Sequence, residues 1–220
     1  MGEITKPKVE LIYWTQDIHK VIALNYKTCV EQEICKDASK LTDEEAWQVT
    51  DAVMKGRHAT SLETINFGFA IEGVSRVHTH QLVRHKIGTS YNHRSERAVL
   101  NLDYDITVPP TIRDNKEALE IYLNLWHQSQ EAYAKLINLG IHREDARFLF
   151  LQGVETKLIW TVNLRAFLDI CRIRLNQDMQ HEMRCVVSMC AKEVVNHHPW
   201  LRLYIHNIDK VNEWIEYNTK

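Results

Sequence analysis

The sequence is poor in residues that interrupt or cross-link a chain. Its 220 residues include only seven glycines and four prolines, which argues against long disordered linkers. The five cysteines are an odd number and form no Cys-x-x-Cys pair, so we expect reduced thiols in a cytoplasmic protein. No apolar run approaches the roughly 20 residues that span a bilayer. The net charge of −2 indicates neither a nucleic-acid partner nor a membrane partner.

Several catalytic motifs are also missing. The chain has no Gly-x-Ser-x-Gly turn, no Walker loop and no Gly-x-Gly-x-x-Gly motif. It has no His-Glu-x-x-His and no Cys–His spacing typical of zinc, so we expect no metal site. An activated nucleophile is therefore not recognisable. Positioning of an anionic ligand beside an organic cofactor fits the sequence better than covalent catalysis by a side chain.

Hydrophobic periodicity predicts an α+β fold that is rich in helices. Apolar residues alternate over 65–71 and again over 158–162, as on the buried face of a strand. Residues 86–97 have no clear period and are predicted to be a polar loop. Strict βαβ alternation is absent, so we predict one domain over residues 1–220 with a small mixed sheet. Helices are predicted over 42–56, 75–85, 115–140, 144–151, 164–175, 178–197 and 208–217.

The first polar cluster spans residues 84–97 and holds four Lys/Arg, two His and three Ser/Thr. Arginine forks and hydroxyl groups on a loop can cradle a phosphate. A solvated basic surface loop would have the same composition, so composition alone leaves both interpretations open. A metal site at His78, His80 and His85 is a further alternative. It is disfavoured because residues two apart on a helix point to nearly opposite sides.

The second polar cluster follows the second predicted strand. Arg165, Asp169 and Arg172 are spaced i, i+4 and i+7, so they share one face of a predicted helix. Taken alone, a structural face of salt bridges explains this spacing more simply than ligand binding does. We expect Glu182 to pair with a neighbouring arginine. The other polar members of the cluster are Asn163, Arg174, Asp178 and Gln180.

Together the two clusters resemble the flavin-dependent thymidylate synthases. The signature of that family runs Arg-His-Arg, two residues, Ser, four residues, Ser, one residue, Arg. Similar positions occur in order over roughly residues 50–200. The signature positions here are Gln81, Arg84, His85, Lys86, Ser90, Asn92, Ser95 and Arg97. The flanking positions are His58, Thr60, Glu63, Ala146, Arg147, Trp160 to Asn163, Arg165, Arg174, Gln180 and Glu182.

The resemblance implies a thymidylate-synthase-complementing type of fold and a homotetramer that binds FAD between subunits. It implies methylation of dUMP to dTMP, with methylenetetrahydrofolate as carbon donor and NADPH as reductant. Arg174 would be catalytic, stabilising negative charge that develops on the pyrimidine ring. The nucleotide would be held by Gln81, Arg84, Ser95, Glu96 (through its backbone), Arg97, Arg147 and Arg174. The flavin would be lined by Thr60, Glu63, Arg84, His85, Lys86, Ser90, Asn163, Arg165 and Asp169.

The sequence also departs from the family pattern. Lys86 replaces an arginine and loses its bidentate fork, and one extra residue precedes Ser90. Asp169 stands where the family usually has Asn, which changes the charge of a site expected to be buried. An acid near the base could accept a hydrogen bond from the amine of cytosine. A relative that acts on dCMP or adds a hydroxymethyl group therefore stays an alternative, as does a non-catalytic nucleotide-binding protein. The other departures are His93, Ala98 and Asp178.

Overall fold

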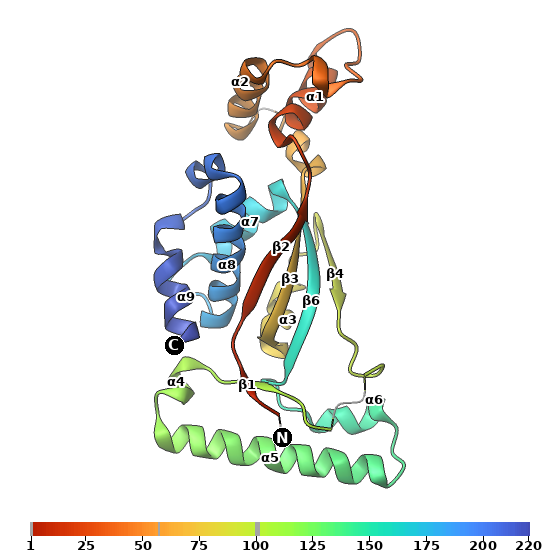
Figure 1. Cartoon of the computed structure of the whole chain (residues 1–220), viewed down its shortest axis with the longest axis vertical. Helices are drawn as coiled ribbons and strands as arrows, with labels where there is room; N and C mark the ends of the chain where they lie inside the picture. Colours follow the sequence, from red (N-terminus) through yellow and green to blue (C-terminus); the bar gives the residue numbers. More distant parts are fainter. Residues whose placement is uncertain (1, 57, 100–101) are drawn as a thin grey trace.

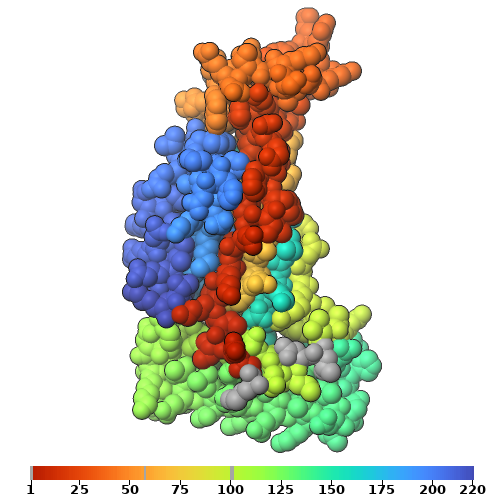
Figure 2. Space-filling view, viewed as in Figure 1, coloured from red at the N-terminus to blue at the C-terminus, as the bar shows by residue number. Residues whose placement is uncertain are grey.

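The computed structural model describes residues 2–56, 58–99 and 102–220. A sheet runs along the middle of an elongated molecule, with α7, α8 and α9 over one of its faces (Figure 1). Helices α1 and α2 project beyond one end of the sheet, and α5 crosses the other end (Figure 2). No helix in these residues is long and apolar enough to cross a membrane. The helices are α1 (Ile18–Val30), α2 (Asp43–Met54), α3 (Arg76–Leu82), α4 (Pro110–Arg113), α5 (Lys116–Asn138), α6 (Arg143–Ala146), α7 (Leu164–Arg174), α8 (His181–His197) and α9 (Val211–Thr219).

Four antiparallel strands form the main sheet, in the order β2-β3-β6-β4. At its centre Phe69 of β3 lies opposite Trp160 of β6, and Tyr91 of β4 lies opposite the same Trp160. A second, two-stranded sheet pairs β1 and β5 in parallel. The strands are β1 (Ile4–Thr5), β2 (Lys8–Trp14), β3 (Asn66–Ser75), β4 (Thr89–His93), β5 (Ile106–Thr107) and β6 (Glu155–Asn163).

The alternation predicted for the two central strands is confirmed. Phe67, Phe69, Trp160 and Val162 are fully buried on the face that packs against α7 and α8. The ring of Phe69 stacks on Trp160 at 5.5 Å and on Phe167 of α7 at 5.9 Å between centroids. These aromatic contacts fix how α7 lies on the sheet. The helix-rich α+β class with small sheets is therefore confirmed.

Side-chain caps mark the starts of several predicted helices. Thr42 and Glu45 form a capping box at the start of α2, which lies within the helix predicted over 42–56. Ser75 caps α3 by accepting a hydrogen bond from the backbone N–H of His78 at 3.0 Å. Asn115 caps α5 in the same way. Such caps satisfy N–H groups that have no partner within the helix, which is why they could be found in the sequence.

Strands β1, β2, β4 and β5 were not obtained from the sequence. Residues 89–93 form the edge strand β4, so the polar loop predicted for 86–97 was wrong over this part. Its outward residues Ser90 and Asn92 are polar and exposed, which hides the alternation. In β2 a bulge between Leu11 and Tyr13 shifts the pairing register and breaks the two-residue period.

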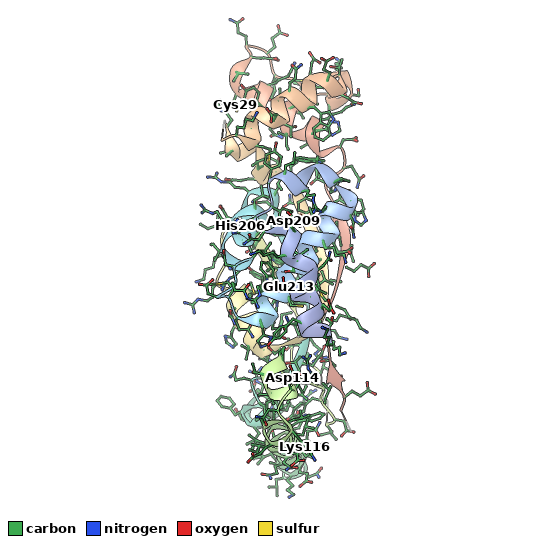
Figure 3. All side chains as sticks on the ribbon, turned by 90° about the vertical axis from the view of Figure 1, so that its left-hand side faces the viewer. Cys29, Asp114, Lys116, His206, Asp209 and Glu213 are labelled. Atoms are coloured by element: carbon green, nitrogen blue, oxygen red, sulfur yellow. The ribbon has the colours of Figure 1, made fainter. Side chains whose placement is uncertain are left out.

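The far ends of the molecule lie away from the sheet's packed face. Seen from the side, Cys29 in α1 lies near one end, and Asp114 and Lys116 at the start of α5 lie near the other (Figure 3). Near α5, Tyr104 and Trp126 form a small separate core. The polar clusters predicted from the sequence lie between these ends, around α3 and α7.

Candidate functional site

A cavity of about 540 Å³ lies between α7 and the segment that follows α3. All of the predicted flavin contacts except Thr60 and Ser90 line it. We call it the α7 cavity. Its lining residues are Glu63, Arg84, His85, Lys86, Ile87, Asn163, Arg165, Ala166, Asp169 and Ile170.

Local backbone chemistry shapes this cavity. Asn163 ends β6 and caps α7, its side chain accepting the N–H of Ala166 at 2.9 Å. The N–H of Asn163 donates to the carbonyl of Gly88 at 2.8 Å. Gly88 has φ of +68°, and a Cβ there would lie 2.4 Å from Nδ2, the side-chain nitrogen of Asn163. Only glycine therefore fits at the turn that closes the cavity.

The charged residues of the α7 cavity are only partly neutralised. Arg165 pairs with Glu63 at 2.7 Å, and Asp169 pairs with Arg172 at 3.6 Å. Within the described part of the chain, Arg84 and Lys86 have no ion pair. The Asp169 side chain is 60% exposed, so the expectation of an acid in a buried site is not met in this subunit. Two unneutralised cations on one wall suit an anionic ligand.

A second cavity, of about 520 Å³, opens on the other side of Arg84. Val77 and Gln81 line it from one face of α3, at positions i and i+4, and Arg84 lines it from the turn that follows α3. We call it the α3 cavity. Because Arg84 lines both cavities, the predicted flavin and nucleotide residues form adjoining sites. The full lining of the α3 cavity is Val77, His80, Gln81, Arg84, Gln152 and Arg174.

Arg174 joins the two cavities. Its Nε donates to Nε2 of His85 at 2.9 Å, and its Nη2 reaches the carbonyl of Gln81 at 3.5 Å. It has no carboxylate partner among the described residues, so a surface pair with Asp178 is not formed. Burial, and then the charge of Arg174, lower the pKa of His85. His85 is therefore neutral. It lines the α7 cavity, and its hydrogen bond holds Arg174, which lines the α3 cavity.

A third cavity, of about 340 Å³, continues from the α3 cavity through His80 and Gln152. Arg147 lines it, and its Nε donates to the carbonyl of Glu144 at 3.1 Å. Glu96 lines it too, with its carboxylate paired to Arg76 at 3.0 Å. The Glu96 side chain is thus occupied, which leaves its backbone for a ligand.

Four predicted residues line none of these three cavities: Thr60, Ser90, Ser95 and Arg97. Arg97 is exposed and forms an ion pair with Glu144 at 3.6 Å. Ser90 points outward from β4, where it is paired with Thr161. One chain therefore gathers most of the predicted site but not all of it.

Three lining residues, Arg76, His80 and Gln152, were missed as ligand-binding candidates. Arg76, His80 and Arg84 follow one another every fourth residue, a spacing that could have placed them on one face of α3. Gln152 lies in the turn before β6, and no signal in the sequence marks it. His80 entered the sequence analysis only as a metal ligand. Among the described residues no group of three or more His, Cys, Asp or Glu could hold a metal ion.

His78 was the second histidine of the alternative metal site. It is fully buried, and both of its ring nitrogens lack a hydrogen-bond partner among the described residues. Burial, and then the charge of Arg174, lower its pKa from 6.5 to about 3. A lowered pKa in the folded state gives stability that is present above pH 6.5 and is lost as the pH falls towards 3.

We therefore expect the free energy of unfolding to fall by about 2 kcal/mol between pH 7 and pH 5, as measured by urea denaturation. The His78→Leu variant should lose much of this pH slope. The matched control His142→Leu, at an exposed position, should keep it. An unchanged slope in His78→Leu would contradict this account.

Contrary to expectation, Glu182 pairs with no arginine of the described chain. Its carboxylate is buried and accepts hydrogen bonds from the backbone N–H and the hydroxyl of Ser75. Burial raises the pKa of this carboxyl. The contact joins the first turn of α8 to the residue that caps α3.

Most of the chain, residues 10–200, matches the family described as thymidylate synthase complementing protein. The chain belongs to this family. The flavin-dependent thymidylate synthase of Clostridium tetani is 33% identical over 213 residues, covering 88% of this chain and 84% of the relative. That of Sulfurisphaera tokodaii is 35% identical over 202 residues, covering 90% and 77%. The resemblance seen in the signature residues is thus confirmed.

A solved structure shares the fold. It is a UMP/dUMP methylase from Streptomyces cacaoi with 5-Br dUMP bound, and its TM-score is 0.77. The match covers 93% of this chain and 98% of that one, at 16% identity. At that identity the likeness establishes the fold alone, and it confirms the predicted fold type. The family is one of methyltransferase enzymes with FAD as cofactor, and methylenetetrahydrofolate and NADPH are its usual partners.

Proposed function

We propose that this chain is a cytoplasmic enzyme that methylates dUMP to dTMP, with FAD, methylenetetrahydrofolate and NADPH. The observation that carries the proposal is the pair of adjoining cavities around Arg84, joined by the His85–Arg174 hydrogen bond. An oxidation–reduction cofactor and its substrate must lie side by side. Family membership supplies the identity of both ligands.

The donor groups of the α7 cavity fit FAD. Arg84 and Lys86 supply cations for the pyrophosphate, which has no glycine-rich helix start to bind in this chain. Asn163 lines the cavity, and because its Oδ1 caps α7, its side-chain nitrogen is the group that would donate to a planar ring. When bound, the flavin supplies the electron transfer of the reaction. The residues of the chain bind it, orient it and present Arg174 to the substrate beside it.

Arg174 is the proposed catalytic residue. Its Nε is engaged by His85, while Nη1 and Nη2 make long contacts, to the sulfur of Met179 at 4.0 Å and the carbonyl of Gln81 at 3.5 Å, which a ligand in the α3 cavity would replace. A pyrimidine C5 is a weak nucleophile, and negative charge develops on the ring as it reacts. A guanidinium held at the base oxygens stabilises that charge without having to reorganise. Gln81 of α3 and Arg84 of the turn after it would hold the base on its other side.

Among the described residues, the α3 cavity offers the amine of cytosine no carboxylate, and the amides of Gln81 and Gln152 can bind either base. Binding of the exocyclic amine of cytosine calls for an acceptor such as a carboxylate. No Asp or Glu lines this cavity in the described residues, and Asp169 lines the α7 cavity instead. The departures at Asp169 and Asp178 therefore give little support for dCMP. Transfer of a methyl group, rather than a hydroxymethyl group, follows the relatives' names.

The proposal is tested by the colour and redox behaviour of the purified protein. The native protein should release FAD on denaturation, and dUMP should accelerate oxidation of its reduced flavin in the presence of methylenetetrahydrofolate. Failure to bind FAD at about 100 μM, far above the affinity of a resident cofactor, would reject the proposal. If the protein binds FAD but dUMP does not accelerate flavin oxidation, the alternative of a non-catalytic nucleotide-binding protein is favoured instead.

A homotetramer is part of the proposal. The support is the incomplete site: Ser95, Arg97, Thr60 and Ser90 lie outside the cavities formed by one chain. Ligands shared between subunits would bring such residues together. Light scattering at micromolar concentration should give the mass of four chains of 25.9 kDa. A monomeric mass would contradict the shared site.

The cysteines give a prediction about mechanism. Cys171, Cys185 and Cys190 are buried, and burial raises the pKa of each thiol, that of Cys185 to about 12. The thiolate is the reactive form, so none of the three is available as a nucleophile. Cys171→Ala should keep its flavin and retain turnover within about threefold of wild type. If it keeps FAD but loses all turnover, the assigned mechanism is wrong.

A further inference from the structure

The start of α3 is tied to α8 by one buried contact. Glu182 is 6% exposed and accepts the N–H of Ser75 at 2.7 Å through one oxygen. Its other oxygen accepts the hydroxyl proton of Ser75. The same hydroxyl accepts the N–H of His78 at 3.0 Å and so caps α3. A carboxylate on α8 therefore holds the residue from which α3 begins.

Of the two helices that this contact joins, α3 lines the α3 cavity, and α8 follows closely on α7, whose last residue also lines it. Helix α3 supplies Gln81, the segment after it supplies Arg84, and Arg174 ends α7. The connecting segment is held to α8 by Arg184, whose Nη1 donates to carbonyls of Asn176, Gln177 and Met179. These bonds thus hold the end of α7, with Arg174, in place relative to the start of α8, with Glu182.

Joining α3 to α8 through a buried carboxylate is less favourable in free energy than joining them through apolar packing. Glu182 has no cation within ion-pairing distance among the described residues, and burial raises the pKa of its carboxyl. A buried charge of this kind costs free energy, and apolar residues of similar volume often pack at least as stably. A role in geometry accounts for a carboxylate here better than a role in stability does.

We propose that Glu182 is a positioning residue of the nucleotide site. Through Ser75 it fixes the start of α3 against α8, so that Gln81 and Arg84 stay aligned with Arg174. The inference rests on the proposed function for the identity of the nucleotide. The contact itself is independent of that identity.

The test compares three variants of the FAD-loaded protein. Glu182→Met keeps the side-chain volume but has no oxygen to accept the bonds of Ser75. Glu182→Gln keeps an acceptor for the N–H and a donor for the hydroxyl. Ser188→Ala alters another fully buried polar residue of α8, outside this contact, and serves as the control. Two quantities are measured: the dUMP dissociation constant by calorimetry, and amide hydrogen exchange over residues 76–85.

In Glu182→Met we expect dUMP binding to weaken by about tenfold or more and exchange in α3 to quicken by a similar factor, with FAD content retained. Glu182→Gln should stay within about threefold of wild type in both measurements. Ser188→Ala should match wild type. Rescue by Gln, together with an unaffected Ser188→Ala, separates positioning from a general loss of packing.

Wild-type dUMP affinity and wild-type exchange in Glu182→Met would overturn the inference. If that variant does not fold, Glu182→Asp replaces it. Its shorter side chain cannot reach both donors, so the same changes are expected at smaller size, and wild-type values would be equally decisive. If the wild-type protein binds no dUMP, the proposed function fails, while the exchange measurement still decides whether Glu182 holds α3.

Discussion

Arg174→Ala is expected to lower turnover by roughly 100-fold or more, about 3 kcal/mol, while the fold and most of the bound flavin are retained. The reason is the position of the guanidinium in the α3 cavity, where burial lowers its pKa and no carboxylate of the described chain neutralises it. Its Nε donates a hydrogen bond to Nε2 of His85, and a neutral imidazole does not neutralise the guanidinium. An exposed arginine paired with a carboxylate would contribute well under 1 kcal/mol.

The measurement is stopped-flow oxidation of the reduced flavin with and without dUMP. The matched control is Arg172→Ala, two residues earlier on α7, where the side chain is 75% exposed and pairs with Asp169. The control should keep turnover within about threefold. Wild-type turnover in Arg174→Ala would reject its catalytic role and the placement of the base in the α3 cavity.

Arg84→Ala is expected to weaken both ligands at once. Arg84 lines the α7 cavity and the α3 cavity, and it has no ion pair among the described residues. Hydrogen bonds to charged groups contribute about 1.5–3 kcal/mol each, so the affinity for FAD and the affinity for dUMP should each fall by roughly 10- to 150-fold. Few single residues of this chain can produce such a paired loss.

Lys86→Ala is the comparison that makes this prediction specific. Lys86 lines the α7 cavity but not the α3 cavity. Its removal should weaken FAD binding, measured by fluorescence quenching, and leave the dUMP dissociation constant of FAD-saturated protein unchanged. If Arg84→Ala affects one ligand alone, the two cavities do not adjoin in the way described.

Local signals in the sequence located much of the fold. The alternation of Phe67, Phe69 and Ile71 marks a strand because one face of the sheet is buried. Ser75 and Asn163 mark helix starts because their side chains accept otherwise unpaired N–H groups. Most of the predicted flavin residues then meet in one cavity, since Asn163 ends a strand and begins α7 beside the turn at Gly88.

Contacts between distant segments could not be read in this way. The His85–Arg174 bond joins residues 89 positions apart, and the Ser75–Glu182 bond spans 107 positions. Neither spacing leaves a periodic trace, so the Ser75 partner of Glu182 was missed and a neighbouring arginine was expected instead. The strand β4 was missed because its outward side chains are polar.

The most direct test of the account is mass spectrometry of the nucleotide product. Purified protein is incubated with FAD, NADPH and methylenetetrahydrofolate carrying an isotope-labelled methylene carbon, with dUMP in one reaction and dCMP in another. The account predicts that dUMP gains one labelled methyl group and becomes dTMP, while dCMP is unchanged. A labelled product from dCMP, a hydroxymethylated product, or unaltered dUMP with FAD bound would contradict it.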